Sequence, residues 1–167
     1  MPADGELAAL VVAARRGDQS AWDALVHRFA PLVWGVARGH GLNATAAADV
    51  AQTTWLRLVE NLASVGHDDL GPWLASCTRA ESAQALRWID PRRDRRPARD
   101  PDAETLWVAV EGLPARSRLA LRVLAVSPAP TDDEFAAALG CTVEAGRLFA
   151  ADCLRRLSEK LPSATNQ

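Results

Sequence analysis

The sequence predicts an all-α protein with two helical domains joined by a flexible linker. Hydrophobic residues make up 49% of the 167 residues, which is enough to form a core. The chain has no Tyr, only 10 Gly and few runs of β-branched residues, which disfavours a sheet. Apolar residues recur at helical spacing on both sides of one stretch rich in Arg, Asp and Pro. The length suits one medium domain or two small ones.

Charge and cysteine content narrow the class of protein. The formal net charge is −2, so any contact with DNA must come from local basic patches. Cys77, Cys141 and Cys153 are widely spaced and include no CxxC motif, which indicates buried or free thiols in a reducing compartment. The N-terminus lacks a basic region followed by an apolar segment, and no run of about 18 apolar residues occurs. We therefore expect a soluble, cytoplasmic protein with no membrane insertion.

The N-terminal domain, predicted for residues 1–88, opens with two helices. Residues 6–16 form a short helix that ends before a Gly-Asp pair. Ser20 is predicted to cap a longer helix over 20–38, with Asp23 three residues on in a capping-box-like position. The apolar face of the longer helix is expected to hold Trp22, Leu25, Val26, Phe29, Val33 and Val36.

Residues 49–60 are the most informative stretch of the chain, on a helix capped by Asn43 or Thr45. A burial stripe is predicted for Ala51, Trp55, Leu58 and Leu62. A second stripe lies on the outer side and holds Asp49, Gln52, Thr53, Leu56 and Glu60. A helix that only filled a core would not need an acid, an amide and a leucine aligned there. The outer stripe is therefore interpreted as a docking surface for another protein, the alternative being an ordinary solvated face.

A turn at residues 66–71 leads into a helix expected from Pro72 to Trp88, because Pro suits a first helical turn. Residues 89–104 then carry five Arg, five acids and three Pro, which prevents both a helix and a core. This linker is interpreted as a plain tether or as an arm that contacts nucleic acid. It permits a closed form in which each half hides the other's binding face.

The C-terminal domain, predicted for residues 105–167, has a helix-turn-helix pattern. Thr131 and Glu134 are spaced as a capping box, in which each side chain bonds the other's backbone amide. A tight turn at 139–142 follows and separates the short helix from a longer one. The helices expected here run over 103–111, from Pro114 to about Val126, from Thr131 to Leu139, and onward to about Leu161.

Several motifs resemble one known family. In the N-terminal half they are Arg16-Gly17-Asp18-x-x-Ala21-Trp22, Asp49-x-x-Gln52-x-x-Trp55-Leu56-Arg57 and Trp73-Leu74. In the C-terminal half they are Gly112-Leu113-Pro114-x-Arg116-x-Arg118 and Glu134-Phe135-Ala136-x-x-Leu139-Gly140. Their order and spacing resemble the extracytoplasmic-function (ECF) class of bacterial sigma factors in the sigma-70 family. The likeness covers roughly residues 6–88, similar to region 2, and 105–161, similar to region 4.

The resemblance implies partners for each half. Region 2 binds the clamp coiled coil of core RNA polymerase and melts the promoter −10 element, whereas region 4 binds the polymerase flap and reads the −35 element. The residues implied for polymerase contact are Asp49, Gln52, Leu56 and Glu60. Those implied for the −10 element are Arg79, Gln84, Arg87 and Trp88, and those for the −35 element are Thr142 and Arg147.

The recognition helix departs from the family pattern. Phe149 and Asp152 occupy two positions where the family usually has Arg. Asp152 and Glu144 would repel phosphates, and each lost Arg–phosphate contact weakens DNA binding. We therefore expect weak recognition of the −35 element by this domain. In the preceding domain Ala80 and Gln84 replace a family Asn and Asp, so the promoter sequence is not predicted.

The resemblance implies a sigma factor that directs core RNA polymerase to promoters and assists melting of the −10 element. The alternative is a sigma-like interaction protein that binds polymerase or an anti-sigma partner without normal −35 recognition. The expected partners are core RNA polymerase, promoter DNA and a candidate anti-sigma factor. An enzyme is not expected, because no Gly-rich phosphate loop, HExxH motif or nucleophile arrangement occurs. His27, His40 and His67 are isolated, so no metal site and no cofactor are expected.

Overall fold

The computed structural model describes residues 2–87, 106, 108–127 and 129–161. All regular structure in these residues is helical and no β-strand occurs among them, which confirms the predicted all-α class. No helix of the described part of the chain is long and apolar enough to cross a membrane. The predicted linker at 89–104 lies outside the described residues, so its expected flexibility stays a prediction.

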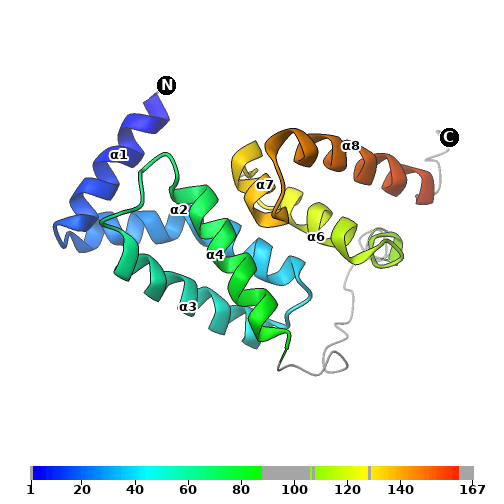
Figure 1. The fold of residues 1–167 in the computed structure, drawn as a ribbon, viewed down its shortest axis with the longest axis horizontal. Helices are drawn as coiled ribbons and strands as arrows, with labels where there is room; N and C mark the ends of the chain where they lie inside the picture. The colour runs from blue at the N-terminus through cyan, green and yellow to red at the C-terminus, as the bar shows by residue number, and fades with distance from the viewer. Residues whose placement is uncertain (1, 88–105, 107, 128, 162–167) are drawn as a thin grey trace, which may run out of the picture.

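The N-terminal half is a group of helices arranged around α2. They are α1 (Pro2–Arg15), α2 (Gln19–Gly39), α3 (Ala44–Asn61) and α4 (Leu70–Ala85). Helix α1 packs on α2, and α4 packs on both α2 and α3 (Figure 1). Pro72 is the third residue of α4, where a missing backbone N–H costs no hydrogen bond. The helix ends at Ala85, three residues before the predicted end at Trp88.

Asp18 begins α2, and the prediction that Ser20 caps this helix is wrong. The Asp18 carboxylate accepts hydrogen bonds from the backbone N–H of Ser20 at 2.9 Å and of Ala21 at 3.1 Å. A further hydrogen bond from the Ser20 hydroxyl lowers the pKa of Asp18 below its usual value. Gly17 precedes it with a φ of 86°, a left-handed conformation that favours glycine. The preceding turn thus moves the helix start two residues upstream of the expected cap.

The C-terminal half contains the predicted helix-turn-helix. Residues 108–111 are helical and are followed by α6 (Ala115–Leu124), α7 (Asp132–Leu139) and α8 (Val143–Lys160). The capping box is confirmed, since the backbone N–H of Thr131 donates to Glu134 at 2.8 Å and the Thr131 hydroxyl accepts from the Glu134 amide at 3.2 Å. Gly140 ends α7 with a φ of 64°, which makes the tight turn into α8.

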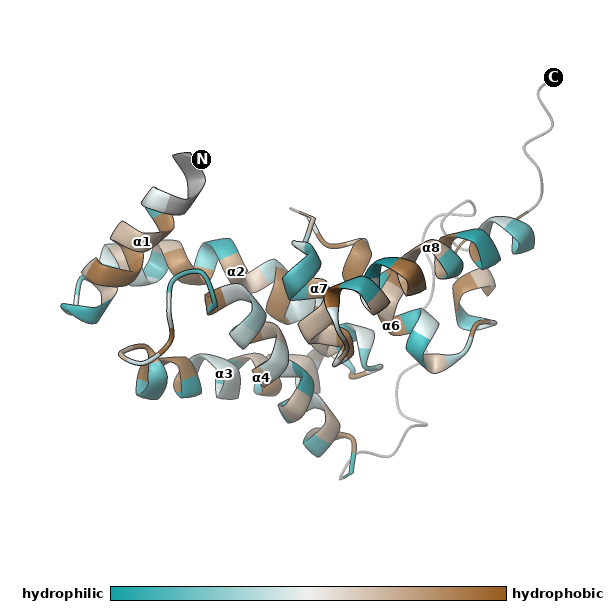
Figure 2. Ribbon diagram, turned by 45° about the horizontal axis from the view of Figure 1, so that its top comes forward, coloured by the Kyte–Doolittle hydropathy of each residue, from teal (hydrophilic) through white to brown (hydrophobic). Residues whose placement is uncertain are grey.

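One apolar cluster runs through both halves of the molecule. It contains buried side chains from every labelled helix, among them Val11, Leu25, Leu58, Leu74, Val123, Phe135 and Cys153. In Figure 2 most helices carry hydrophobic residues on part of their circumference and hydrophilic residues on the rest. Helix α7 packs along α4, and α6 packs on α2, so the two halves are joined by a continuous core. The two halves therefore pack against each other, while the predicted polymerase-binding residues of α3 stay exposed.

Candidate functional site

Helix α3 carries the outer stripe that the sequence predicts as a docking surface. Asn43 caps the helix, and its side-chain oxygen accepts a hydrogen bond from the backbone N–H of Ala46 at 2.7 Å. The four residues predicted to bind polymerase are all exposed: Asp49, Gln52, Leu56 and Glu60. They are spaced three or four residues apart and so form one line along the helix, here called the α3 face. Leu56 is 58% exposed, a large apolar surface for a solvated position.

The buried side of α3 differs in part from the predicted stripe. Leu58 and Leu62 are buried as expected, whereas Ala51 and Trp55 are half-buried. Thr54 takes a core position because its hydroxyl donates to the Val50 carbonyl at 2.9 Å. The hydroxyl also lies 3.4 Å from that of a buried threonine in α4. A polar side chain that satisfies its hydrogen bonds locally can thus replace an apolar one in the core.

An open apolar groove, here called the α2–α3 groove, borders the α3 face. Its lining residues are Trp22, Trp34, Ala48, Ala51, Gln52, Trp55, Leu56 and Val59. A second hollow shares Trp34 and Trp55 with it and extends along α2 past His27 and Pro31. Trp34 is 43% exposed and Val59 is 61% exposed. Exposed aromatic and aliphatic side chains gathered around a groove are typical of protein-binding surfaces.

Sequence reasoning missed Trp34 and Val59 as members of this surface. Both are large apolar residues that fall outside the burial stripes of their own helices. An apolar residue on the wrong face of an amphipathic helix is the signal that would have identified them. The acidic side chains of the α3 face flank the groove, so the surface combines an apolar centre with negative charge.

Helix α4 holds α3 in place through an ion pair and a buried polar contact. The Arg57 guanidinium lies 2.6 Å from the Glu81 carboxylate, which is only 13% exposed. Glu81 is therefore engaged within the fold. Burial, reinforced by the negative charge of Glu81, raises the pKa of the Cys77 thiol, so this cysteine is neutral at neutral pH.

The structure does not bring the predicted −10 residues together. Arg79 is half-buried, whereas Gln84 and Arg87 are exposed near the end of α4, and Arg87 lies beyond the last helical residue. Trp88 lies outside the described residues. The Arg79 guanidinium faces the turn of the helix-turn-helix, where a Cβ added to Gly140 would lie 3.2 Å from its Cζ atom.

His40 lies next to Arg79 at the end of α2. Its Nε2 atom and the Nε atom of Arg79 are buried and have no hydrogen-bond partner among the described residues. Burial lowers the pKa of His40, and the positive charge of Arg79 lowers it further. His40 is therefore neutral at neutral pH, and protonation would place a second positive charge in this region.

The predicted −35 residues are engaged within the helix-turn-helix. The Thr142 hydroxyl caps α8 by accepting a hydrogen bond from the backbone N–H of Ala145 at 3.3 Å. Arg147 donates from two nitrogens to the Asp132 carboxylate of α7, at 2.6 and 2.8 Å. Phe149, one of the two departures from the family pattern, is half-buried, with Arg116 5.4 Å above its ring.

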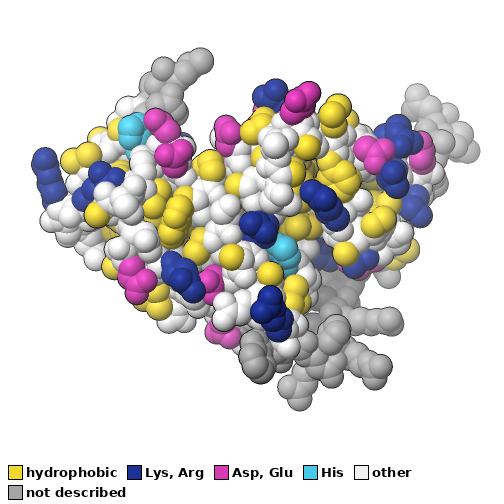
Figure 3. All heavy atoms as spheres, in the orientation of Figure 1, with side chains coloured by type: hydrophobic (Ala, Val, Ile, Leu, Met, Phe, Trp, Pro, Cys, Tyr) yellow, Lys and Arg dark blue, Asp and Glu magenta, His cyan; other side chains and the backbone are white. Residues whose placement is uncertain are grey.

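The remaining arginines of α8 are also paired with acids. Arg155 contacts Asp152 at 2.5 Å and Glu159 at 2.6 Å, and Arg156 contacts Asp152 at 2.6 Å. The hydrogen bond from Arg155 lowers the pKa of Asp152. On the face shown in Figure 3, basic and acidic side chains are interspersed rather than gathered by sign. Such pairing weakens the positive field that attracts a DNA backbone.

Comparison with known proteins assigns a family model to part of the chain. Residues 25–90 match the model of sigma-70 region 2, a segment that contains α3 and α4. The match spans less than half of the chain and does not extend to the helix-turn-helix. No curated protein sequence matches the chain significantly.

Among the described residues, His, Cys, Asp and Glu side chains form no group that could hold a metal ion.

A solved structure shares the fold of nearly the whole chain. It is the structure of CnrH in complex with the cytosolic domain of CnrY. The TM-score is 0.68 at 22% sequence identity, and the alignment covers 92% of this chain and 96% of that chain. At this identity the likeness establishes the fold, including the presence of both halves.

Proposed function

We propose that the chain is a sigma factor of the ECF class that binds core RNA polymerase and directs it to promoters. The observation that carries the proposal is the sigma-70 region 2 match over residues 25–90. This segment includes the α3 face and part of the α2–α3 groove, the surface with exposed leucine, amide and acids. The proposal assigns region 2 to residues 1–88 and region 4 to residues 105–167, with 89–104 as the linker between them.

The chemistry of the α3 face fits a polymerase helix with apolar and basic side chains. Leu56 would enter an apolar site on the partner, while Asp49 and Glu60 would fix the register against positive charges. After docking, α4 would face the −10 element, where Arg79 and Arg87 would hold phosphates and Gln84 would offer an amide to a base. This activity requires no cofactor and no catalytic residue, and it places the protein in the cytoplasm with the polymerase.

A second candidate function is a sigma-like interaction protein without normal −35 recognition. The acid pairing of all three arginines of α8 favours this alternative, because a DNA-reading helix needs free cationic side chains. The likeness to CnrH, solved with the cytosolic domain of CnrY, supports a protein partner of that kind, an anti-sigma factor, for this chain as well.

Run-off transcription separates the two candidates. The purified chain is mixed with core RNA polymerase and a library of promoter fragments from its own genome, and transcripts are mapped. A sigma factor gives specific transcripts that depend on the added chain. Binding to polymerase without any such transcript supports the interaction protein. No co-purification with core polymerase would contradict the sigma factor and would leave only the form of the second candidate that binds an anti-sigma partner.

A further inference from the structure

Several glycines in the N-terminal half lie directly against side chains of the C-terminal half, where a larger residue would clash. Gly35 lies inside α2, where glycine costs the helix about 1 kcal/mol relative to alanine. A Cβ on Gly35 would overlap a methyl group of Val126, and one on Gly39 would lie 2.6 Å from Cδ1 of Leu119. Gly35 and Gly39 are one helical turn apart and both are buried, so together they form a flat site on α2 against which Leu119 of α6 and Val126, two residues after α6, pack.

A third glycine, Gly71 in the first turn of α4, allows Glu134 of the C-terminal half to approach this helix closely. A Cβ on Gly71 would lie 2.8 and 2.9 Å from two carbons of the Glu134 side chain. Glu134 cannot simply swing away, because one of its carboxylate oxygens accepts the capping hydrogen bond from the Thr131 amide. Asp69, the N-cap of α4, makes no side-chain cap hydrogen bond, so the Glu134 carboxylate lies at a helix start that its own cap leaves open.

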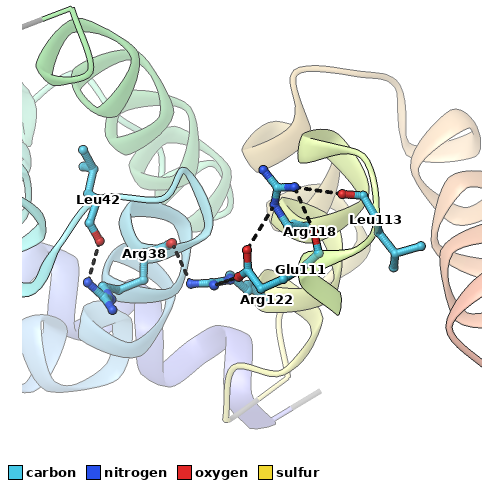
Figure 4. Close-up of polar contacts among 6 residues, drawn as sticks. All are labelled: Arg38, Leu42, Glu111, Leu113, Arg118 and Arg122. Atoms are coloured by element: carbon cyan, nitrogen blue, oxygen red, sulfur yellow. Dashed lines mark hydrogen bonds and ion pairs between the residues drawn. The ribbon is translucent and has the colours of Figure 1, made fainter. Parts of the chain in front are cut away.

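Polar contacts join the same two halves. Figure 4 shows Arg122 of α6 between the halves, where one nitrogen donates to the Arg38 carbonyl at 3.3 Å and another contacts Glu111 at 2.6 Å. On the other side of the interface, the Arg79 guanidinium lies against the turn at Gly140. The contacts therefore extend from the end of α2 to the middle of α4.

We propose that the C-terminal half is an intramolecular cover that holds the chain closed through Gly35, Gly39 and Gly71 and thereby masks Arg79. The consequence for DNA rests on the proposed function of α4, whereas the closure itself does not. Helices of a free-standing N-terminal domain would gain stability from alanine at position 35, so the glycine is explained by what packs on it. DNA contact through Arg79 then requires α7 to leave α4, and the fraction of open chains limits the apparent affinity.

Small-angle X-ray scattering of the full chain tests the closure directly. A compact chain of this length has a radius of gyration of about 15 Å, and separation of the halves increases it by several ångströms. The test variants combine Gly35→Ala with Gly39→Ala, or Gly35→Gln with Gly39→Gln. The matched control is Gly5→Ala, since Gly5 lies in α1 and an added Cβ there meets nothing within 4 Å.

The closure predicts a compact wild-type chain, a compact Gly5→Ala chain and an extended Gln variant. The Ala variant should shift the closed–open equilibrium by about tenfold or more toward the open form. Circular dichroism must show unchanged helix content, which separates opening from unfolding. A wild-type chain that is already extended, or a folded Gln variant as compact as wild type, would overturn the proposal.

Binding to core RNA polymerase, measured on the same samples, keeps this proposal separate from the proposed function. Extended glycine variants that fail to bind polymerase would leave the closure standing and remove the sigma-factor function. Polymerase binding together with a Gln variant that stays compact would overturn the closure and leave the sigma-factor function standing.

Discussion

Leu56→Ala tests the α3 face at its most exposed apolar residue. Full burial of a leucine side chain contributes about 1.5–3 kcal/mol, and Leu56 still has 58% of its surface exposed in the free chain. Docking can therefore gain about 0.9–1.7 kcal/mol from this side chain, which corresponds to about a four- to nineteenfold change in Kd. Alanine is as good a helix former as leucine, so α3 should remain folded.

The assay is a fluorescence titration of the labelled chain with core RNA polymerase at fixed ionic strength. Val12→Ala is the control, because Val12 is 44% exposed on α1, away from the α2–α3 groove. We expect Leu56→Ala to weaken binding about four- to nineteenfold and Val12→Ala to leave it unchanged. A change below twofold for Leu56→Ala, or an equal loss for Val12→Ala, would refute the assignment of the α3 face.

Further predictions concern stability, pH and DNA binding. Leu58→Ala should lower the free energy of unfolding by about 2–5 kcal/mol in urea, because Leu58 is fully buried. Stability should fall as the pH drops through about 6.5, since burial lowers the pKa of His40 and the unfolded chain takes up the proton first. His40→Gln should flatten that pH dependence. Asp152→Asn should release Arg156 and leave Arg155 paired with Glu159 alone, so binding of the chain to duplex DNA should become tighter and more salt-dependent.

Matched variants isolate each of these effects. His27→Gln replaces an exposed histidine and is the matched control for the loss of an imidazole at position 40. Asp133→Asn removes an acid that starts α7 and has the same charge change as Asp152→Asn, yet it should not steepen the salt dependence as strongly. If Asp133→Asn and Asp152→Asn tighten DNA binding equally, only net charge matters and the pairing argument fails.

Local patterns predicted the helix-turn-helix and the exposure of the α3 face correctly, whereas docking through that face stays a prediction. The capping box of Thr131 and Glu134 involves residues three apart, and the turn at Gly140 needs a glycine for its left-handed backbone. The exposure of Leu56 follows from its position on the helix relative to the buried Leu58. Each of these features is decided within about one helical turn, where sequence spacing fixes which side chains meet.

Contacts between distant segments could not be read from spacing. Arg147 meets Asp132 fifteen residues away because the turn at Gly140 folds α8 back on α7. Arg79 meets the same turn from the other half of the chain, and Gly35 meets Val126. No periodicity encodes these partners, so the sequence allowed a closed form without predicting which residues close it.

Site-specific photocrosslinking tests polymerase docking through the α3 face most directly. A photoreactive amino acid replaces Leu56 in one full-length chain and Val12 in another, and each is irradiated with core RNA polymerase. We expect a strong crosslink to a polymerase subunit from position 56 and little or none from position 12. No polymerase crosslink from position 56, or a stronger one from position 12, would contradict it.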